Sequence, residues 1–400
     1  MNQIRKHRFL LSMTAACAAL PAIQLVPLPP EIWEQLPGRS LVTEIDLAVG
    51  LGPIWRPMTL TPKETWNALF ACAGPAAALI LSMQISPRDR QRTVTLLIAI
   101  FAFSALIGIF QIQGPSDGPL YFYPITNNGS AVGLFANRNH QALMLALMLP
   151  MLAAYAAGRS KGILALSSFG AFIVLPLIMI TGSRAGVLTA AIGVIGIPFI
   201  LSAGRNDESQ QGSMPAPERH RHRTRIWIAL ILCAVSLLAL TIGLGRDVAL
   251  DRLVRSNLSE DLRTAILPIA LAMTKIYFPV GSGMGSFERV YQIFEPDELL
   301  TPKIVNHAHN DWLEAVLTGG APAALLLGIC IASYVTRAIR LVGQRAHATK
   351  AHRESMLGMV MLLQFAVASI GDYPLRTPAL AVVFAVACLW AACLPVRSQA

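Results

Sequence analysis

A series of long apolar stretches constrains the fold of this 400-residue chain more than any other feature. About 17–25 apolar residues in a helix cross a hydrocarbon core of about 30 Å, and such a helix satisfies its own backbone hydrogen bonds in lipid. Hydrophobic residues make up 54% of the sequence and charged residues only 14%, which is unlike a soluble chain. About ten stretches qualify: 9–27, 67–85, 93–112, 140–157, 162–181, 185–202, 226–245, 315–336, 355–371 and 377–395. We therefore predict an all-α polytopic membrane protein that forms a single integral membrane domain over residues 1–400.

The distribution of charge predicts the orientation of these helices. With a cytoplasmic amino terminus, ten crossings place six tracts inside: 1–8, 86–92, 158–161, 203–225, 337–354 and 396–400. These tracts hold 19 of the 32 Lys and Arg residues but only 5 of the 22 Asp and Glu residues, which is the positive-inside pattern. The net charge of +10 is therefore topogenic, and we expect no nucleic-acid partner but contact with membrane lipid. Both termini are expected in the cytoplasm, although the first stretch could instead be a cleaved signal peptide.

Three segments outside the membrane are long enough to fold: 28–66, 113–139 and 246–314. The last is predicted to be a large periplasmic loop. Its apolar spacing predicts two amphipathic helices, Leu262 to Phe278 and Phe287 to Phe294, separated by a glycine-rich turn, and each could lie on the membrane with its apolar side down. On the cytoplasmic side, the polar tract 203–225 has the composition of a disordered loop.

Four polar clusters fall on the predicted outer face, where membrane packing does not require them. They are Asn137-Arg138-Asn139-His140, Thr181-Gly182-Ser183-Arg184, Arg263, and Asn306-His307-Ala308-His309-Asn310-Asp311, and Asp372 and Arg376 in the last outer turn could join them. Each has a structural alternative, because arginines anchor helices at interfaces and asparagines cap helix ends. The His-X-His pair could also be part of a metal site, but no third ligand has suitable spacing, so we predict no metal.

The clusters together indicate chemistry on a diphosphate. Guanidinium groups stay charged and bind phosphates through paired hydrogen bonds. A histidine with an ordinary pKa near 6.5 can accept the proton of a sugar hydroxyl. This combination suits a lipid-linked diphosphate donor, whose leaving group the arginines neutralise while a histidine activates the acceptor. No cofactor is needed for this reaction.

The order of these motifs resembles the O-antigen ligase and polymerase superfamily. The matching segments are Gly-Leu-Phe-Ala-Asn-Arg-Asn-His at 133–140, Thr-Gly-Ser-Arg-Ala-Gly at 181–186, Arg263, Pro-Val-Gly-Ser-Gly-Met-Gly-Ser-Phe at 279–287, and His-Ala-His-Asn-Asp-Trp-Leu-Glu at 307–314 followed by Gly319-Gly320. The resemblance spans residues 130–330. It implies a helical fold of the integral-membrane glycosyltransferase type in the bacterial inner membrane, with its active face in the periplasm.

The resemblance also implies roles for individual residues. It implies a metal-independent ligase, active in lipopolysaccharide biosynthesis, that moves a glycan from undecaprenyl diphosphate to an acceptor sugar such as a lipid core. Arg184 and Arg263 match diphosphate-binding arginines, and His309 matches the catalytic histidine. The remaining cluster members are candidates for substrate binding: Arg138, Asn139, His140, His307, Asn310 and Arg376.

Two other functions stay open at this point. A polymerase of the same superfamily would extend another lipid-linked glycan, so its acceptor differs. A transporter or flippase for such lipids is a different class, and the scarcity of charged residues within the predicted spans argues against it.

Overall fold

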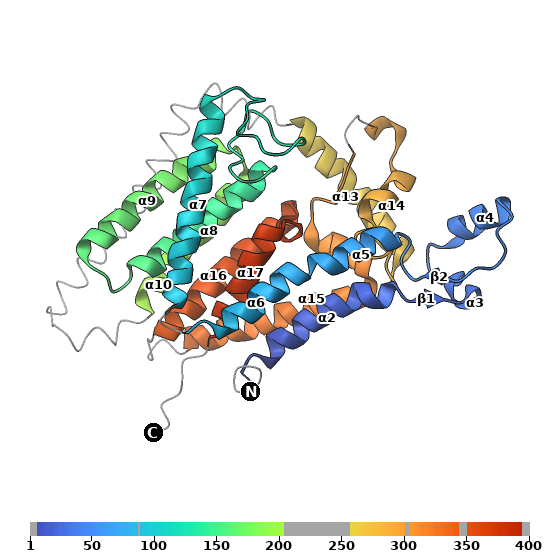
Figure 1. The fold of residues 1–400 in the computed structure, drawn as a ribbon, viewed down its shortest axis with the longest axis horizontal. Coiled ribbons are helices and arrows are strands. Elements are labelled where there is room, and N and C mark those ends of the chain that lie inside the picture. Colours follow the sequence, from blue (N-terminus) through green and yellow to red (C-terminus); the bar gives the residue numbers. More distant parts are fainter. Residues whose placement is uncertain (1–5, 87–88, 204–256, 301–303, 344–349, 394–400) are drawn as a thin grey trace. The chain divides into compact units, whose positions relative to one another are not determined.

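The computed structural model describes residues 6–86, 89–203, 257–300, 304–343 and 350–393, and its regular secondary structure is almost entirely helical (Figure 1). The longer helices, labelled as in the figure, are α2 (Arg8–Gln24), α5 (Pro62–Ala71), α6 (Ala73–Gln84), α7 (Arg90–Gln113), α8 (Arg138–Ala156), α9 (Lys161–Ile180), α10 (Arg184–Ser202), α13 (Asn257–Tyr277), α15 (Asp311–Gly343), α16 (Lys350–Gly371) and α17 (Pro378–Ala391). The short elements are β1 (Pro27–Leu28), α3 (Pro30–Trp33), α4 (Ser40–Ala48), β2 (Arg56–Pro57), α14 (Phe287–Phe294), η1 (Asp297–Leu299) and η2 (Pro374–Arg376). The prediction of an all-α fold is confirmed.

Six helical segments of the described chain are long and apolar enough to cross a membrane. They are Pro62–Gln84, Arg90–Gln113, Lys161–Ile180, Arg184–Ser202, Asp311–Leu341 and Lys350–Gly371. Each overlaps one of the predicted stretches. Helices α2, α8 and α17 occupy three further stretches, although α2 and α17 are shorter apolar helices. The stretch 226–245 and all but the first residue of the tract 203–225 lie outside the described residues. The chain is thus an integral membrane protein with several spans, and the total of ten stays a prediction.

The described chain divides into two compact units, each assembled from separate stretches of sequence. The first unit draws on Met1–Met83, Leu258–Arg337 and Ser369–Ala385, and the second on Gln84–Asn257, Ala338–Ala368 and Val386–Ala400. The histidine pair therefore belongs to the first unit, whereas Arg138 and Arg184 belong to the second.

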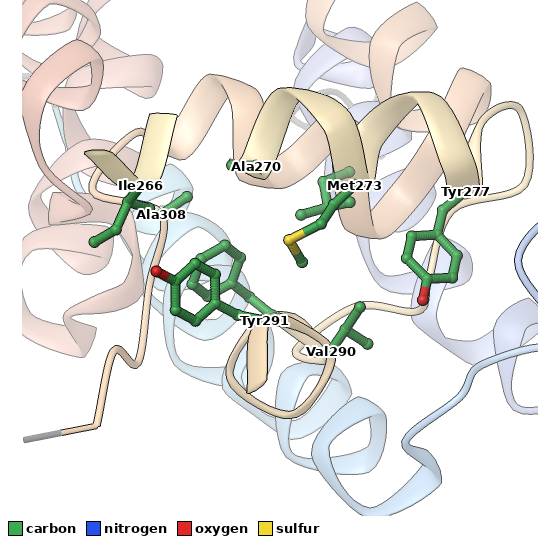
Figure 2. Packing of buried hydrophobic residues seen from close by; sticks show 9 residues of the cluster. Ile266, Ala270, Met273, Tyr277, Val290, Tyr291 and Ala308 are labelled. Atoms are coloured by element: carbon green, nitrogen blue, oxygen red, sulfur yellow. The ribbon is translucent and has the colours of Figure 1, made fainter. Parts of the chain in front are cut away.

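In the first unit, α13 and α14 pack against each other through their apolar faces. Figure 2 shows Ile266, Ala270, Met273 and Tyr277 on the side of α13 that faces Val290 and Tyr291 of α14. Both helices were predicted, but at these positions the apolar side is covered by protein and does not rest on the membrane. The same cluster buries Phe287, Ala308 and Leu317. Because Ala308 stands between His307 and His309, this packing fixes the loop that carries both histidines.

The glycine-rich turn between α13 and α14 closes a break in α15. Gly320 has φ +62° and ψ −151°, so the helix is interrupted there and the carbonyl groups just before it lose their helical partners. The turn supplies replacements: the N–H of Ser282 donates to Leu317 (3.1 Å) and the N–H of Gly283 to Thr318 (2.9 Å). Beyond the break, the N–H of Ala321 donates to the carbonyl of Pro279 (2.7 Å).

Replacing Gly320 with alanine is expected to destabilise the first unit. This backbone conformation is nearly exclusive to glycine and costs other residues about 1–3 kcal/mol. A Cβ there would also lie 2.1 Å from the Pro279 carbonyl oxygen. Thermal unfolding in detergent would measure the loss. Gly328→Ala in the same helix is the matched control, because a Cβ at Gly328 meets nothing within 4 Å. Equal stability of the two variants would contradict the assigned role of the break.

In the second unit, α8 packs against α7, α9 and α10 and is buried along almost its whole length. Its contact with α10 is close at the N-terminal ends, since a Cβ built on Gly186 would lie 2.4 Å from that of Ala142. Further along, Gln364 of α16 donates from its amide to the carbonyls of Ala146 (2.9 Å) and Thr189 (2.9 Å), and so joins α8 to α10. The starts of α8 and α10 are therefore held side by side.

Candidate functional site

Both histidines of the His-X-His motif lie against carboxylates. Nδ1 of His307 is 3.0 Å from Oε1 of Glu314, and Nδ1 of His309 is 3.4 Å from Oδ1 of Asp372. A neutral imidazole that bonds a carboxylate through Nδ1 must donate its proton there, which leaves Nε2 as an acceptor. About a quarter of each histidine side chain is exposed, 25% and 22%, while Glu314 and Asp372 are buried. In each pair the carboxylate is thus placed to orient the imidazole, so that the histidine can act as a base.

Glu314 connects the histidine loop to the first turns of α15. Its carboxylate is fully buried and accepts the N–H of Ala308 at 2.8 Å in addition to its contact with His307. Nε of Arg376 lies 3.2 Å from Oε1 of Glu314 and supplies the compensating charge. Glu314 therefore holds the loop at the residue between the two histidines.

His309 has an unusual backbone conformation. Its φ is +50°, and among the residues that the structure describes it is the one non-glycine with positive φ. Such conformations are uncommon outside glycine and persist where the surroundings impose them, often at functional sites. The next residue, Asn310, accepts the N–H of Leu313 at 3.0 Å and so caps α15. Asn310, predicted to bind substrate, thus has a local structural role.

The turn between α16 and α17 completes this cluster. Asp311 accepts from Nε of Arg376 (3.2 Å), from the hydroxyl of Ser369 (3.3 Å) and from the N–H of Leu375 (3.2 Å). The ring of Tyr373 lies 4.3 Å from the imidazole of His307 and 5.1 Å from that of His309, centre to centre. The structure therefore brings Asp372 and Arg376 beside the histidines, as the sequence suggested, and adds Glu314, Tyr373 and Ser369.

Removing Arg376 is expected to destabilise this cluster strongly. Its side chain is 20% exposed, and it is placed against two carboxylates that are 9% and 1% exposed. Taking one partner from a buried ion pair costs about 3–5 kcal/mol because the remaining charge is uncompensated. Thermal unfolding of Arg376→Ala in detergent tests this, with Arg376→Lys expected to retain part of the stability. Arg340→Ala is the control, because Arg340 is an exposed arginine of α15, the helix that carries both carboxylates. An Arg376→Ala protein as stable as the control would refute the pairing.

The second unit carries Arg138 and Arg184 at the starts of α8 and α10. Both helices are capped, since Asn137 accepts the N–H of Asn139 (2.9 Å) and Ser183 accepts the N–H of Gly186 (3.0 Å). Arg184 is exposed and Arg138 is partly exposed. The two arginine motifs lie close together, because a Cβ at Gly182 would be 3.5 Å from Nη1 of Arg138. Two helix amino termini and two guanidinium groups give this end of the unit a positive potential suited to a phosphate-bearing ligand.

Other predicted site residues are placed differently. His140 is buried, 4% exposed, with its ring edge-on to Phe135 at 6.2 Å, which is the environment of a packing residue. Asn139 is partly exposed in the first turn of α8. Arg263 lies in α13, but its side chain is outside the part of the chain that the structure describes. Within that part, no three His, Cys, Asp or Glu side chains are grouped to hold a metal ion.

Glu314 and Tyr373 are functional candidates that the sequence did not single out. Glu314 is the last residue of the motif that begins at His307. An acidic residue in the first turn of a helix is common, because it interacts favourably with the helix dipole. Its contact with Ala308 and His307 depends on the loop folding back over the helix. Tyr373 gave no comparable indication in the sequence.

The fold and this cluster define an integral membrane protein in which buried acids contact partly exposed histidines at the start of a membrane-spanning helix. Residues 169–328 match the family model described as O-antigen ligase. This match includes Arg184, Arg263, His307 and His309, and it confirms the resemblance to the O-antigen ligase and polymerase superfamily. No curated protein matches the chain. The family match supports a membrane enzyme of the ligase or polymerase type that acts on glycans.

Proposed function

We propose that this protein is a metal-independent glycosyltransferase that moves a glycan from undecaprenyl diphosphate to an acceptor sugar at the periplasmic face of the inner membrane. The observation that carries the proposal is the His309–Asp372 pair. Asp372 orients the imidazole through Nδ1, and the other nitrogen is left to act on a hydroxyl. The family match and the helical membrane fold support the same class of reaction.

In the proposed reaction His309 is the general base. Nε2 takes the proton of the acceptor hydroxyl as its oxygen forms a bond to the anomeric carbon of the donor. The bond from that carbon to the diphosphate breaks, and the diphosphate leaves with the electron pair. Asp372 stabilises the imidazolium that forms, as a carboxylate does when it is bonded to a catalytic histidine. These bond changes need neither an oxidant nor a metal ion.

Arginines are proposed to bind the leaving diphosphate. Arg184 and Arg263 are the primary candidates, and the position of Arg138 beside the Gly182 turn makes it the third. Charge developing on the leaving group would be stabilised by donors that are already oriented toward it. Arg376 is better suited to holding Asp311 and Glu314, since its Nε faces both carboxylates.

The proposal is tested with purified protein, a lipid-linked glycan donor and a lipid-core acceptor in the presence of excess chelator. We expect the glycan to appear on the acceptor. Elongation of glycan on its lipid carrier, without transfer to the core, would identify a polymerase. Movement of the donor across vesicles without any product would identify a transporter and overturn the proposed chemistry. Activity lost to the chelator and restored by zinc would make the histidines metal ligands.

A further inference from the structure

Between α2 and α5 the chain forms a small folded segment, residues 25–61, which we call the α4 platform. Antiparallel pairing of β1 with β2 brings its two ends together. Trp33 is buried and donates from its indole nitrogen to the carbonyl of Pro57 at 2.8 Å. Arg56 and Asp46 form a two-pronged ion pair, with contacts of 2.9 and 2.5 Å. The platform is therefore an ordered structure.

A buried arginine fastens this platform to the rest of the first unit. Arg39 is fully buried and donates to the carbonyls of Pro37 (2.9 Å), Met58 (2.6 Å) and Gly281 (3.0 Å). Burial lowers the pKa of Arg39 to about 10. The contact with Gly281 joins the platform to the glycine-rich turn that closes the break in α15. The position of α4 is therefore set within this unit.

Helix α4 nevertheless buries none of its own residues. Leu41, Ile45 and Val49, spaced four residues apart, form an apolar stripe on one side and are 42%, 51% and 64% exposed. Leu47 on another side of the helix is also exposed, and three more exposed apolar side chains follow the helix: Leu51, Ile54 and Trp55. A nine-residue helix is too short to be stable alone in water, so its amphipathic face needs an apolar environment.

We propose that this stripe inserts into the interfacial region of the lipid bilayer, which makes the α4 platform a membrane-docking element. Both of its ends connect directly to apolar helices, and exposed apolar side chains continue past each end, Ile23 before the platform and Trp66 and Phe70 after it. A surface-lying helix with an apolar face and a tryptophan nearby is typical of interfacial binding.

The charges of the platform indicate that insertion is driven by apolar burial. Residues 25–61 contain four acidic side chains and two arginines. Both arginines are bonded internally, Arg39 to carbonyl groups and Arg56 to Asp46. The platform therefore has no excess of positive charge to attract anionic headgroups, and its binding to lipid should be insensitive to salt.

The test places a nitroxide at Ile45→Cys or at Glu44→Cys in the full-length protein, with its six cysteines replaced and the protein reconstituted in lipid nanodiscs. Both side chains are exposed, but they lie on different sides of α4. We expect collisions with oxygen to dominate at position 45 and collisions with a water-soluble nickel chelate to dominate at position 44, with a several-fold difference in the ratio. Leu41→Cys should repeat the result for position 45, and high salt should leave it unchanged.

Three results would overturn the proposal. If positions 41 and 45 behave like position 44, the stripe faces water. If they are shielded from both reagents, protein covers the stripe, as a second copy of the chain would. If high salt releases them from lipid, electrostatic attraction holds the platform. None of these measurements depends on the proposed glycosyltransferase activity.

Discussion

Replacing His309 with alanine should reduce glycan transfer by about 10²–10⁴-fold, the contribution of a well-placed general base. The protein should still accumulate in the membrane, because His309 is not part of the buried apolar cluster around Ala308. His307→Ala should be less damaging, and Asp372→Asn should lower the rate while the donor still binds. The measurement is the rate of transfer at saturating donor.

A matched comparison separates catalysis from folding in this experiment. Tyr373 contacts both imidazoles, so a structural role would affect His307→Ala and His309→Ala similarly. A His309→Ala enzyme that keeps near-normal rates would contradict its assignment as the base. If His307→Ala lowers the rate of transfer more than His309→Ala does, the general base is His307, paired with Glu314.

Alanine at Arg184 or Arg263 should lower transfer by about 10²–10³-fold, the usual cost of losing one oriented donor to a developing negative charge. Lysine should restore little activity, because an ammonium group cannot reproduce the two-pronged guanidinium contact. Arg184 is exposed at the first position of α10, so its replacement should leave the helix packing intact. Initial rates and donor binding should be measured together.

The control for the arginine series is Arg92→Ala. The Arg92 side chain is 87% exposed and forms a surface ion pair of 2.8 Å with Asp89, so its loss removes a positive charge without disturbing a buried contact. Transfer by this variant should be close to normal. If Arg184→Ala and Arg263→Ala behave like Arg92→Ala, they serve as interfacial anchors and do not bind diphosphate.

Much of the helical framework could be predicted from the sequence, because apolar length and helical periodicity are local properties. Helix α14 begins and ends at the predicted residues. Helix α13 ends close to its predicted end but starts earlier, at Asn257. The hairpin between α9 and α10 is as short as expected. The break at Gly320 was not predicted, since a pair of glycines in an apolar helix does not reveal a conformation that depends on a distant turn.

Some residues of the candidate site could be predicted from the sequence, but their pairings could not. The sequence suggested that Asp372 and Arg376 could join the polar clusters that include His307 and His309. It could not indicate that Arg376 is engaged by Asp311 and Glu314, because those contacts join segments more than sixty residues apart. Burial of His140 was likewise hidden, since a polar residue at a helix start has the same sequence pattern whether it faces solvent or a neighbouring ring.

The break in α15 has a mechanical consequence. A continuous helix transmits rotation and tilt along its length, so a span that adjusts to the thickness of the bilayer would turn every residue attached to it. Gly320 interrupts α15 nine residues after its start, and the turn at 279–283 bonds to carbonyl groups on one side of the interruption and to an N–H on the other. The hydrogen bonds to that turn therefore hold the start of α15, with Glu314 and the histidine loop, in place. We expect the spacing of the two imidazoles to stay constant while the remainder of α15 tilts with the lipid around it.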